Sequence, residues 1–155
     1  EGIKLDTVKR IKEVERGRIR EYAEEYPSCE YVPRSSEIWT LDCDIALPCA
    51  TQNELDGDSA QTLVENGVMA VGEGANMPST PEAINTFLEN EVLFVPAKAA
   101  NAGGVATSAL EMTQNSMFSS WSFEEVDQKL KDIMVGIYEE TSRLATNLDH
   151  LVSRF

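Results

Sequence analysis

The chain has 155 residues, of which 27 are Asp or Glu and 13 are Lys or Arg, so its formal net charge is −14 at pH 7. A negative field of this size repels the phosphates of nucleic acids and anionic lipids, so neither is an expected partner. No apolar run approaches the roughly 20 residues of a membrane helix, and the amino-terminal stretch is charged throughout. We expect a soluble, cytoplasmic protein of one domain with one core.

The cysteines, Cys29, Cys43 and Cys49, are odd in number and lack the paired spacing of a zinc site or a disulfide framework. We expect reduced thiols and no metal site. Cys49 follows Pro48 in a loop and could be considered a nucleophile, but the only histidine is distant in sequence. A small buried thiol is the preferred interpretation.

The first third of the chain predicts a helix followed by a loop. Residues 6–26 carry apolar side chains at mostly helical spacing and stop before Pro27, with Asp6 as the expected N-cap and Gly17 as a weak point. The segment Ser28–Thr40 shows neither the helical nor the strand period. It is predicted to be a loop, with one short strand as an alternative.

Three short apolar runs follow, and each leads into a loop of small polar residues and then a helical stretch. The runs are Cys43–Leu47, Val68–Val71 and Val92–Val95, about 24 residues apart, as in parallel strands joined by crossover helices. The pattern predicts an α/β domain with a mainly parallel sheet.

The two crossover helices have clear boundaries in the sequence. The first spans residues 58–65 and is ended by Asn66–Gly67. The second is capped by Ser79 or Thr80 and has Pro81 at its first position, where a missing N–H costs nothing.

Two further helices are expected after the last strand. One runs from about Val105 to Asn115, and the stretch from Met112 to Met117 is expected to pack in the core. A long carboxyl-terminal helix begins at Ser122, which forms a capping box with Glu125. Its apolar stripe consists of Val126, Leu130, Ile133, Met134, Ile137 and Tyr138.

The loops after the three strands are the place to look for a ligand, because such loops converge beyond the carboxyl ends of parallel strands. They are Pro48–Glu54, Gly72–Pro78 and Pro96–Gly104, and all are built from small residues with a few amides. Small residues let a flat ligand approach the backbone while amides hold its polar edges, which predicts a nucleotide or nicotinamide crevice. The alternative is that these residues make tight turns and that Asn76 and Asn101 cap local backbone.

The chain resembles the hexameric glutamate dehydrogenases in three ordered blocks: DIALPCATQNEL from Asp44, VGEGANMPSTPEA from Val71 and PAKAANAGGVATSALEMTQNS from Pro96. The resemblance runs from Glu1 to about Glu140. It implies the carboxyl-terminal portion of a dinucleotide-binding domain, which is a partial, three-layer Rossmann-like fold with a long carboxyl-terminal helix.

Two features depart from the family pattern. Ala97 stands where the family usually has glycine, and residues 141–155 do not resemble the family's domain-linking segment. No Gly-x-Gly-x-x-Gly turn follows a strand, so the pyrophosphate-binding turn is expected upstream of Glu1.

The resemblance implies an enzyme that transfers a hydride from glutamate to NAD or NADP, with NADP slightly favoured, and yields 2-oxoglutarate and ammonia. The family's catalytic lysine and aspartate belong to an amino-terminal domain, so no catalytic residue is expected in this chain. The parent enzyme is expected to be a homohexamer, and this chain alone is expected to be inactive.

The resemblance also assigns four cofactor-binding positions. Ala50 and Thr51 would line the cleft beneath the nicotinamide half of the cofactor. Asn76 would contact the nicotinamide ribose, and Asn101 would hold the carboxamide and so select the ring face that is presented.

Two positions would bind the substrate. Val105 would pack on the methylenes of glutamate, and Ser108 would hydrogen-bond its side-chain carboxylate near the positive end of a helix. Without the resemblance, Ser108 is an ordinary small helix residue. Lys98 either pairs with Glu73 or is solvated.

Two other functions stay open from the sequence. One is a non-catalytic small-molecule-binding or regulatory α/β module that keeps the crevice without catalysis. The other is a related dehydrogenase for a different amino acid, although Ser108 favours a polar substrate side chain.

Overall fold

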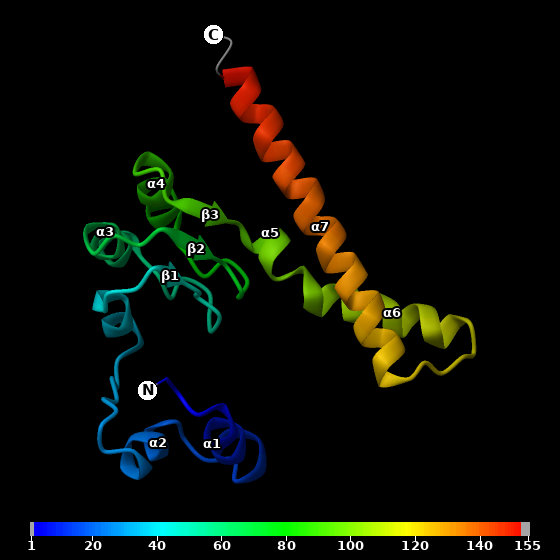
Figure 1. The fold of residues 1–155 in the computed structure, drawn as a ribbon, viewed down its shortest axis with the longest axis horizontal. Helices are drawn as coiled ribbons and strands as arrows, with labels where there is room; N and C mark the ends of the chain where they lie inside the picture. Colours follow the sequence, from blue (N-terminus) through cyan, green and yellow to red (C-terminus); the bar gives the residue numbers. More distant parts are fainter. Residues whose placement is uncertain (1, 153–155) are drawn as a thin grey trace. The chain divides into compact units, whose positions relative to one another are not determined.

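The computed structural model describes residues 2–152 of the chain (Figure 1). The chain divides into two compact units, of which the first ends at Ile38 and the second begins at Trp39. Within the described residues no helix is both long enough and apolar enough to cross a membrane.

The first unit contains three short helical segments in place of the single helix predicted for residues 6–26. They are α1 (Leu5–Lys9), the π-helix η1 (Arg10–Val14) and α2 (Arg20–Glu25). The prediction of one continuous helix is wrong because Arg16 adopts a left-handed conformation with φ of 57°. The backbone N–H of Arg18 then donates to Oε1 of Glu21 at 2.7 Å, which starts α2.

Two other details of this region differ from the prediction. Lys4 occupies the N-cap position of α1, and Asp6 lies in the first turn without a capping hydrogen bond, so the N-cap assignment to Asp6 is wrong. The segment Ser28–Thr40 contains no described strand; it ends in the 3₁₀ helix η2 (Ser35–Thr40).

The second unit is built around a three-stranded parallel sheet, as predicted. Its strands are β1 (Ile45–Ala46), β2 (Ala70–Gly72) and β3 (Leu93–Val95), in the order β1-β2-β3 (Figure 1). Ala46 pairs with Val71, and Val71 pairs with Phe94. The apolar runs thus predicted the strands, although each strand is shorter than its run.

The crossover helices α3 (Gly57–Glu65) and α4 (Pro81–Glu89) pack against each other. Asp56 caps α3 by accepting from the N–H of Ser59, and Thr80 rather than Ser79 caps α4. Together with the sheet they form a core cluster of Trp39, Ala46, Leu55, Ala60, Leu63, Val68, Val71, Ala83, Phe87 and Val92. The carboxyl ends of the strands, and hence the loops that follow them, are held by this core.

Three helices follow β3: α5 (Ala97–Ala100), which the sequence did not predict, α6 (Ala102–Ser116) and α7 (Phe123–Val152). The last two contact one another (Figure 1). The capping box at the start of α7 is confirmed, since the N–H of Ser122 donates to Glu125 and the N–H of Glu125 donates to Ser122 Oγ. The α/β class, the parallel sheet and the long carboxyl-terminal helix are therefore confirmed.

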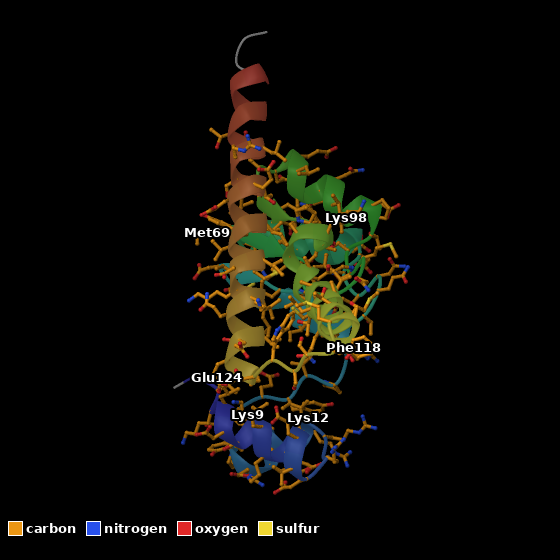
Figure 2. All side chains as sticks on the ribbon, turned by 90° about the vertical axis from the view of Figure 1, so that its right-hand side faces the viewer. Lys9, Lys12, Met69, Lys98, Phe118 and Glu124 are labelled. Carbon is orange, nitrogen blue, oxygen red and sulfur yellow. The ribbon has the colours of Figure 1, made fainter. Side chains whose placement is uncertain are left out.

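The helical pair α6–α7 leaves many apolar side chains exposed. Ile133 and Tyr138 of the predicted stripe are exposed, while its other four residues are half-buried. Met112 and Met117 are also exposed, so the prediction of core packing there is wrong. Phe118, labelled in Figure 2, is fully exposed.

Candidate functional site

A pocket of about 780 Å³ lies at the loops that follow the three strands. Five of the six predicted site residues line it: Ala50, Thr51, Asn76, Asn101 and Val105. Cys49, Gly74 and Gly104 are among the other lining residues. The parallel topology explains this convergence, since all three loops leave the same edge of the sheet.

The first loop is held by the carboxylate of Glu54. Its Oε1 accepts from the backbone N–H of Ala50 at 2.7 Å and of Thr51 at 3.2 Å. Two neighbouring backbone donors on one carboxylate fix the loop conformation, because charge-assisted hydrogen bonds are stronger than neutral ones. The loop therefore presents Ala50 and Thr51 to the pocket in a defined orientation.

The first and second loops approach each other closely. The carbonyl oxygen of Pro48 accepts from the N–H groups of Gly74 at 3.0 Å and Ala75 at 3.1 Å. A Cβ atom at Gly74 would lie 2.3 Å from Sγ of Cys49, so only glycine fits without movement. Cys49 is exposed in the pocket, and its predicted burial is wrong, because the thiol packs on the surface of Gly74 and not in the core.

The second and third loops are joined by two asparagines. Nδ2 of Asn101 donates to the carbonyl oxygen of Ala75 at 2.9 Å and to Oδ1 of Asn76 at 2.8 Å. Asn101 thus bridges loops far apart in sequence instead of capping α6, with which it makes no side-chain capping bond. Among the described residues, no hydrogen bond engages Oδ1 of Asn101 or Nδ2 of Asn76, which leaves one acceptor and one donor at the pocket.

Glu73 immediately precedes Gly74, which lines this pocket, and it was not predicted as a site residue. Its side chain is only 3% exposed, and its carboxylate accepts from the N–H of Ala97 at 2.8 Å and of Ser79 at 3.3 Å. These backbone donors take the place of Lys98 as partners, and within the described part of the chain no ion pair of Lys98 occurs. The position of Lys98 is labelled in Figure 2. The available sequence signal was an acidic residue between two glycines at the end of a buried strand.

The two predicted substrate positions lie on the first turns of α6. Val105 is 72% exposed and lines the pocket. Ser108 lies three residues later and does not line it; its Oγ donates to the carbonyl oxygen of Gly104 at 3.3 Å. The structure therefore places Val105 in the same pocket as the four predicted cofactor-binding residues. The contact of Ser108 with the substrate stays a prediction.

The chemistry of the pocket fits an organic ligand with amide and hydroxyl groups. Its walls combine small side chains with paired amides, and within residues 2–152 no three His, Cys, Asp or Glu residues cluster in a way that could hold a metal ion. A flat ring can approach the backbone at Ala50 and Gly104, and the asparagines offer both a donor and an acceptor.

A family model and individual relatives of known name place the sequence in the same family of dehydrogenases. The sequence model of the Glutamate/Leucine/Phenylalanine/Valine dehydrogenase family matches residues 1–153. The glutamate dehydrogenase of Bacteroides thetaiotaomicron is 57% identical over 97% of this chain, which covers 33% of that protein. The NADP-specific glutamate dehydrogenase of Helicobacter pylori is 50% identical over 94% of this chain and 34% of its own length. The names of other relatives specify NAD, or both coenzymes.

The fold agrees with the sequence match. The crystal structure of Plasmodium falciparum glutamate dehydrogenase superimposes with a TM-score of 0.79 at 48% identity, covering 92% of this chain and 30% of that one. The chain spans about a third of the length of the relatives that it matches. On the sequence match and the shared fold, the chain belongs to the glutamate/leucine/phenylalanine/valine dehydrogenase family.

Proposed function

We propose that this chain forms one wall of the nicotinamide-binding cleft of a glutamate dehydrogenase, which oxidatively deaminates glutamate to 2-oxoglutarate and ammonia. The observation that carries the proposal is the pair Asn76–Asn101, which meets in a pocket lined by small residues at the carboxyl ends of parallel strands. That position is where open α/β sheets bind nucleotides.

The asparagine pair fits the polar edge of a nicotinamide riboside. Oδ1 of Asn101 can accept from the carboxamide NH₂, because its own Nδ2 is already committed to Ala75 and Asn76. Nδ2 of Asn76 can donate to a ribose hydroxyl. The small side chains of Ala50 and Thr51 would lie under the ring and let it approach the backbone.

The beginning of α6 would receive the substrate. Val105 would pack against the methylenes of glutamate, and the Ser108 hydroxyl would turn from its long bond to Gly104 and donate to the side-chain carboxylate. When bound, the nicotinamide accepts the hydride from Cα of glutamate, and the resulting imine is hydrolysed. This chain would orient both reactants, since hydride transfer requires close alignment of donor and acceptor.

The remaining parts of the enzyme belong to the same proposal. The proton-transferring residues would come from an amino-terminal domain of the complete polypeptide, and the complete enzyme would be a cytoplasmic homohexamer. NAD or NADP serves as cofactor, and the relatives carry names for both.

Glutamate-dependent reduction of NAD or NADP by the complete polypeptide tests the proposal, and Asn101→Ala tests the site. The variant should raise the dissociation constant for the cofactor by about two- to tenfold, the value of one hydrogen bond of about 0.5–1.5 kcal/mol. The kcat of the variant should fall by a larger factor than cofactor binding weakens, because the nicotinamide ring is no longer aligned with the substrate. Absorbance at the reduced-nicotinamide band measures the rate, and fluorescence titration measures binding.

Asn90→Ala is the matched control, since Nδ2 of Asn90 also donates to a backbone carbonyl, that of Thr86, but on α4 and outside the pocket. Its kinetic constants should equal those of the wild type. Unchanged kcat and cofactor binding in Asn101→Ala would remove Asn101 from the site. Cofactor binding without any turnover of amino acid would instead support a non-catalytic module.

A further inference from the structure

Glu73 connects the two loops that carry Asn76 and Asn101, although it does not line the pocket in which these asparagines meet. Its own N–H donates to the carbonyl oxygen of Val95 at 3.1 Å and so continues the pairing of β2 with β3. Its side chain turns to the third loop, where Oε2 accepts from the N–H of Ala97 at 2.8 Å. A buried carboxylate with backbone donors on both oxygens has one defined position.

Among the described residues, the backbone N–H of Ala97 has no other hydrogen-bond acceptor than Glu73. Ala97 is the first residue of α5, and the first N–H groups of a helix have no acceptor inside the helix. Pro96 occupies the N-cap position and supplies no side-chain acceptor. Glu73 therefore provides the cap for α5 from a neighbouring loop, and its negative charge suits that end of the helix.

The other end of α5 returns to the loop of Glu73. Asn101 follows α5 directly, and its Nδ2 donates to Ala75 and Asn76, which lie two and three residues after Glu73. The hydrogen bond between Glu73 and Ala97 therefore joins the start of α5 to the loop of residues 73–76, and the hydrogen bond between Asn101 and Asn76 joins its end to the same loop. With the backbone of α5 and of this loop, the two bonds form a closed ring. The distance between the two asparagines depends on both ends of this ring.

We propose that Glu73 is a positioning residue that sets the placement of Asn101 relative to Asn76 by anchoring α5. It acts through α5 and does not touch the cofactor. The inference that it thereby controls cofactor alignment rests on the proposed function. The inference that it controls the geometry of the asparagine pair rests on the hydrogen bonds alone.

Glu73→Gln tests the anchor in the 155-residue chain. Glutamine keeps the size of the side chain but turns one acceptor into an NH₂ group, which faces a backbone N–H and repels it. In ¹H–¹⁵N spectra, the side-chain amide signals of Asn76 and Asn101 should shift. If only the backbone amides of Ser79 and Ala97 move and both side-chain amides stay in place, the proposal is overturned.

Ala97→Pro is the second variant, because it removes the donor and leaves Glu73 intact. Proline is tolerated at the first position of a helix, and Pro96 has the extended conformation, with ψ of 153°, that a following proline requires. Its spectrum should show the same displacement of the two side-chain amides. If neither variant folds, Glu73 has a purely structural role and the positioning role is refuted.

The complete enzyme tests the consequence for the cofactor. Glu73→Gln should lower kcat by about 10- to 100-fold, since small misplacements of reacting groups have effects of that order, and should weaken cofactor binding less than that. The KM for glutamate should change little. A loss of thermal stability with unchanged kcat per folded site and unchanged cofactor binding would contradict the positioning role.

Glu125→Gln is the matched control, because Glu125 also accepts from a backbone N–H at a helix start, that of Ser122, outside the pocket. It should change neither the asparagine signals nor the kinetic constants. If the wild-type complete protein neither binds the cofactor nor turns over glutamate, the proposed function fails. The spectra of the 155-residue chain then still decide whether Glu73 positions the asparagines.

Discussion

Individual residues in the pocket are constrained by close contacts between loops. Gly74 is the tightest of these positions, since an added Cβ would lie 2.3 Å from Sγ and 3.3 Å from Cβ of Cys49. The sulfur of Cys49 can rotate away, but its Cβ cannot, and the backbone that carries this Cβ is held through the hydrogen bonds to Pro48. The glycine is therefore required by space and not by an unusual backbone angle.

Gly74→Ala should lower the free energy of unfolding by about 1–3 kcal/mol, the usual cost of overpacking. In a Cys49→Ala background the sulfur is absent, and the same substitution should cost less than half as much. Denaturant unfolding of the four proteins in this double-mutant cycle measures both values. Equal costs in the two backgrounds would show that Cys49 is not the obstacle.

A substitution of Ser108 distinguishes a role in substrate binding from that of an ordinary helix residue. If its hydroxyl donates to the glutamate carboxylate, Ser108→Ala in the complete enzyme removes a bond to a charged acceptor worth about 1.5–3 kcal/mol. The kcat/KM for glutamate should then fall roughly 10- to 150-fold. Norvaline has no side-chain carboxylate, so its low kcat/KM should be unchanged or improved.

Thr113→Ala is the control for this experiment, because Thr113 also donates its hydroxyl to a carbonyl one turn earlier on α6, that of Ala109. It should leave both substrates unaffected. An equal loss for glutamate and norvaline in Ser108→Ala would exclude the proposed contact.

At the scale of elements, the crossover helices are held at their amino termini by capping side chains. The N–H of Ser59 donates to Oδ1 of Asp56 at 2.9 Å, and this hydrogen bond lowers the pKa of Asp56. Asp56→Ala should reduce the free energy of unfolding by about 0.5–2 kcal/mol. Because asparagine caps as well as aspartate, Asp56→Asn should be close to the wild type at neutral pH.

The lowered pKa of Asp56 predicts that the wild type and Asp56→Asn differ in stability at acidic pH. A carboxyl group whose pKa is lower in the folded state stabilises the protein above its unfolded pKa of about 4, and this stabilisation is lost as the pH falls through the folded value. As the pH falls below about 4, the wild type should therefore lose stability relative to Asp56→Asn. Thermal unfolding of both proteins across this range measures the difference, which should be small because Asp56 is exposed. If the stability difference between the two proteins is the same at all pH values, the lowered pKa of Asp56 is contradicted.

At the scale of the whole molecule, the division at Ile38 separates two sets of buried residues. The core cluster around the sheet begins at Trp39, whose Nε1 donates to the carbonyl oxygen of Glu54 at 3.1 Å. In the first unit Ile11 and Tyr22 are buried, and the ring of Tyr22 stacks on that of Tyr26. Each unit therefore has its own apolar contacts.

A chain consisting of residues 39–155 should unfold cooperatively, because every described member of the core cluster lies within it. Its midpoint temperature should differ from that of the 155-residue chain by no more than about 5 °C, a shift that corresponds to roughly 1 kcal/mol in a domain of this size. Tryptophan fluorescence and circular dichroism measured together check this. Loss of the cooperative transition would show that the first unit is needed for the sheet to fold.

The sequence by itself determined the features that arise from neighbouring residues. The apolar runs predicted the strands, and Pro81, with Ser79 or Thr80 as the expected cap, marked the start of α4. Ser122 with Glu125 marked the start of α7. These signals are local, since a cap or a buried strand is defined within a few residues. The ordered signature blocks added the family, and with it five residues that line one pocket.

Only the tertiary structure decided which groups meet across the loops. Nothing near Glu73 in the sequence shows that Ala97 is its partner, and nothing near Asn101 shows that Asn76 is. The break at Arg16 and the exposure of Cys49 and Met112 were likewise not evident from helical period or residue type. Such features depend on contacts between distant segments, and a backbone donor is satisfied by whichever acceptor the fold brings to it.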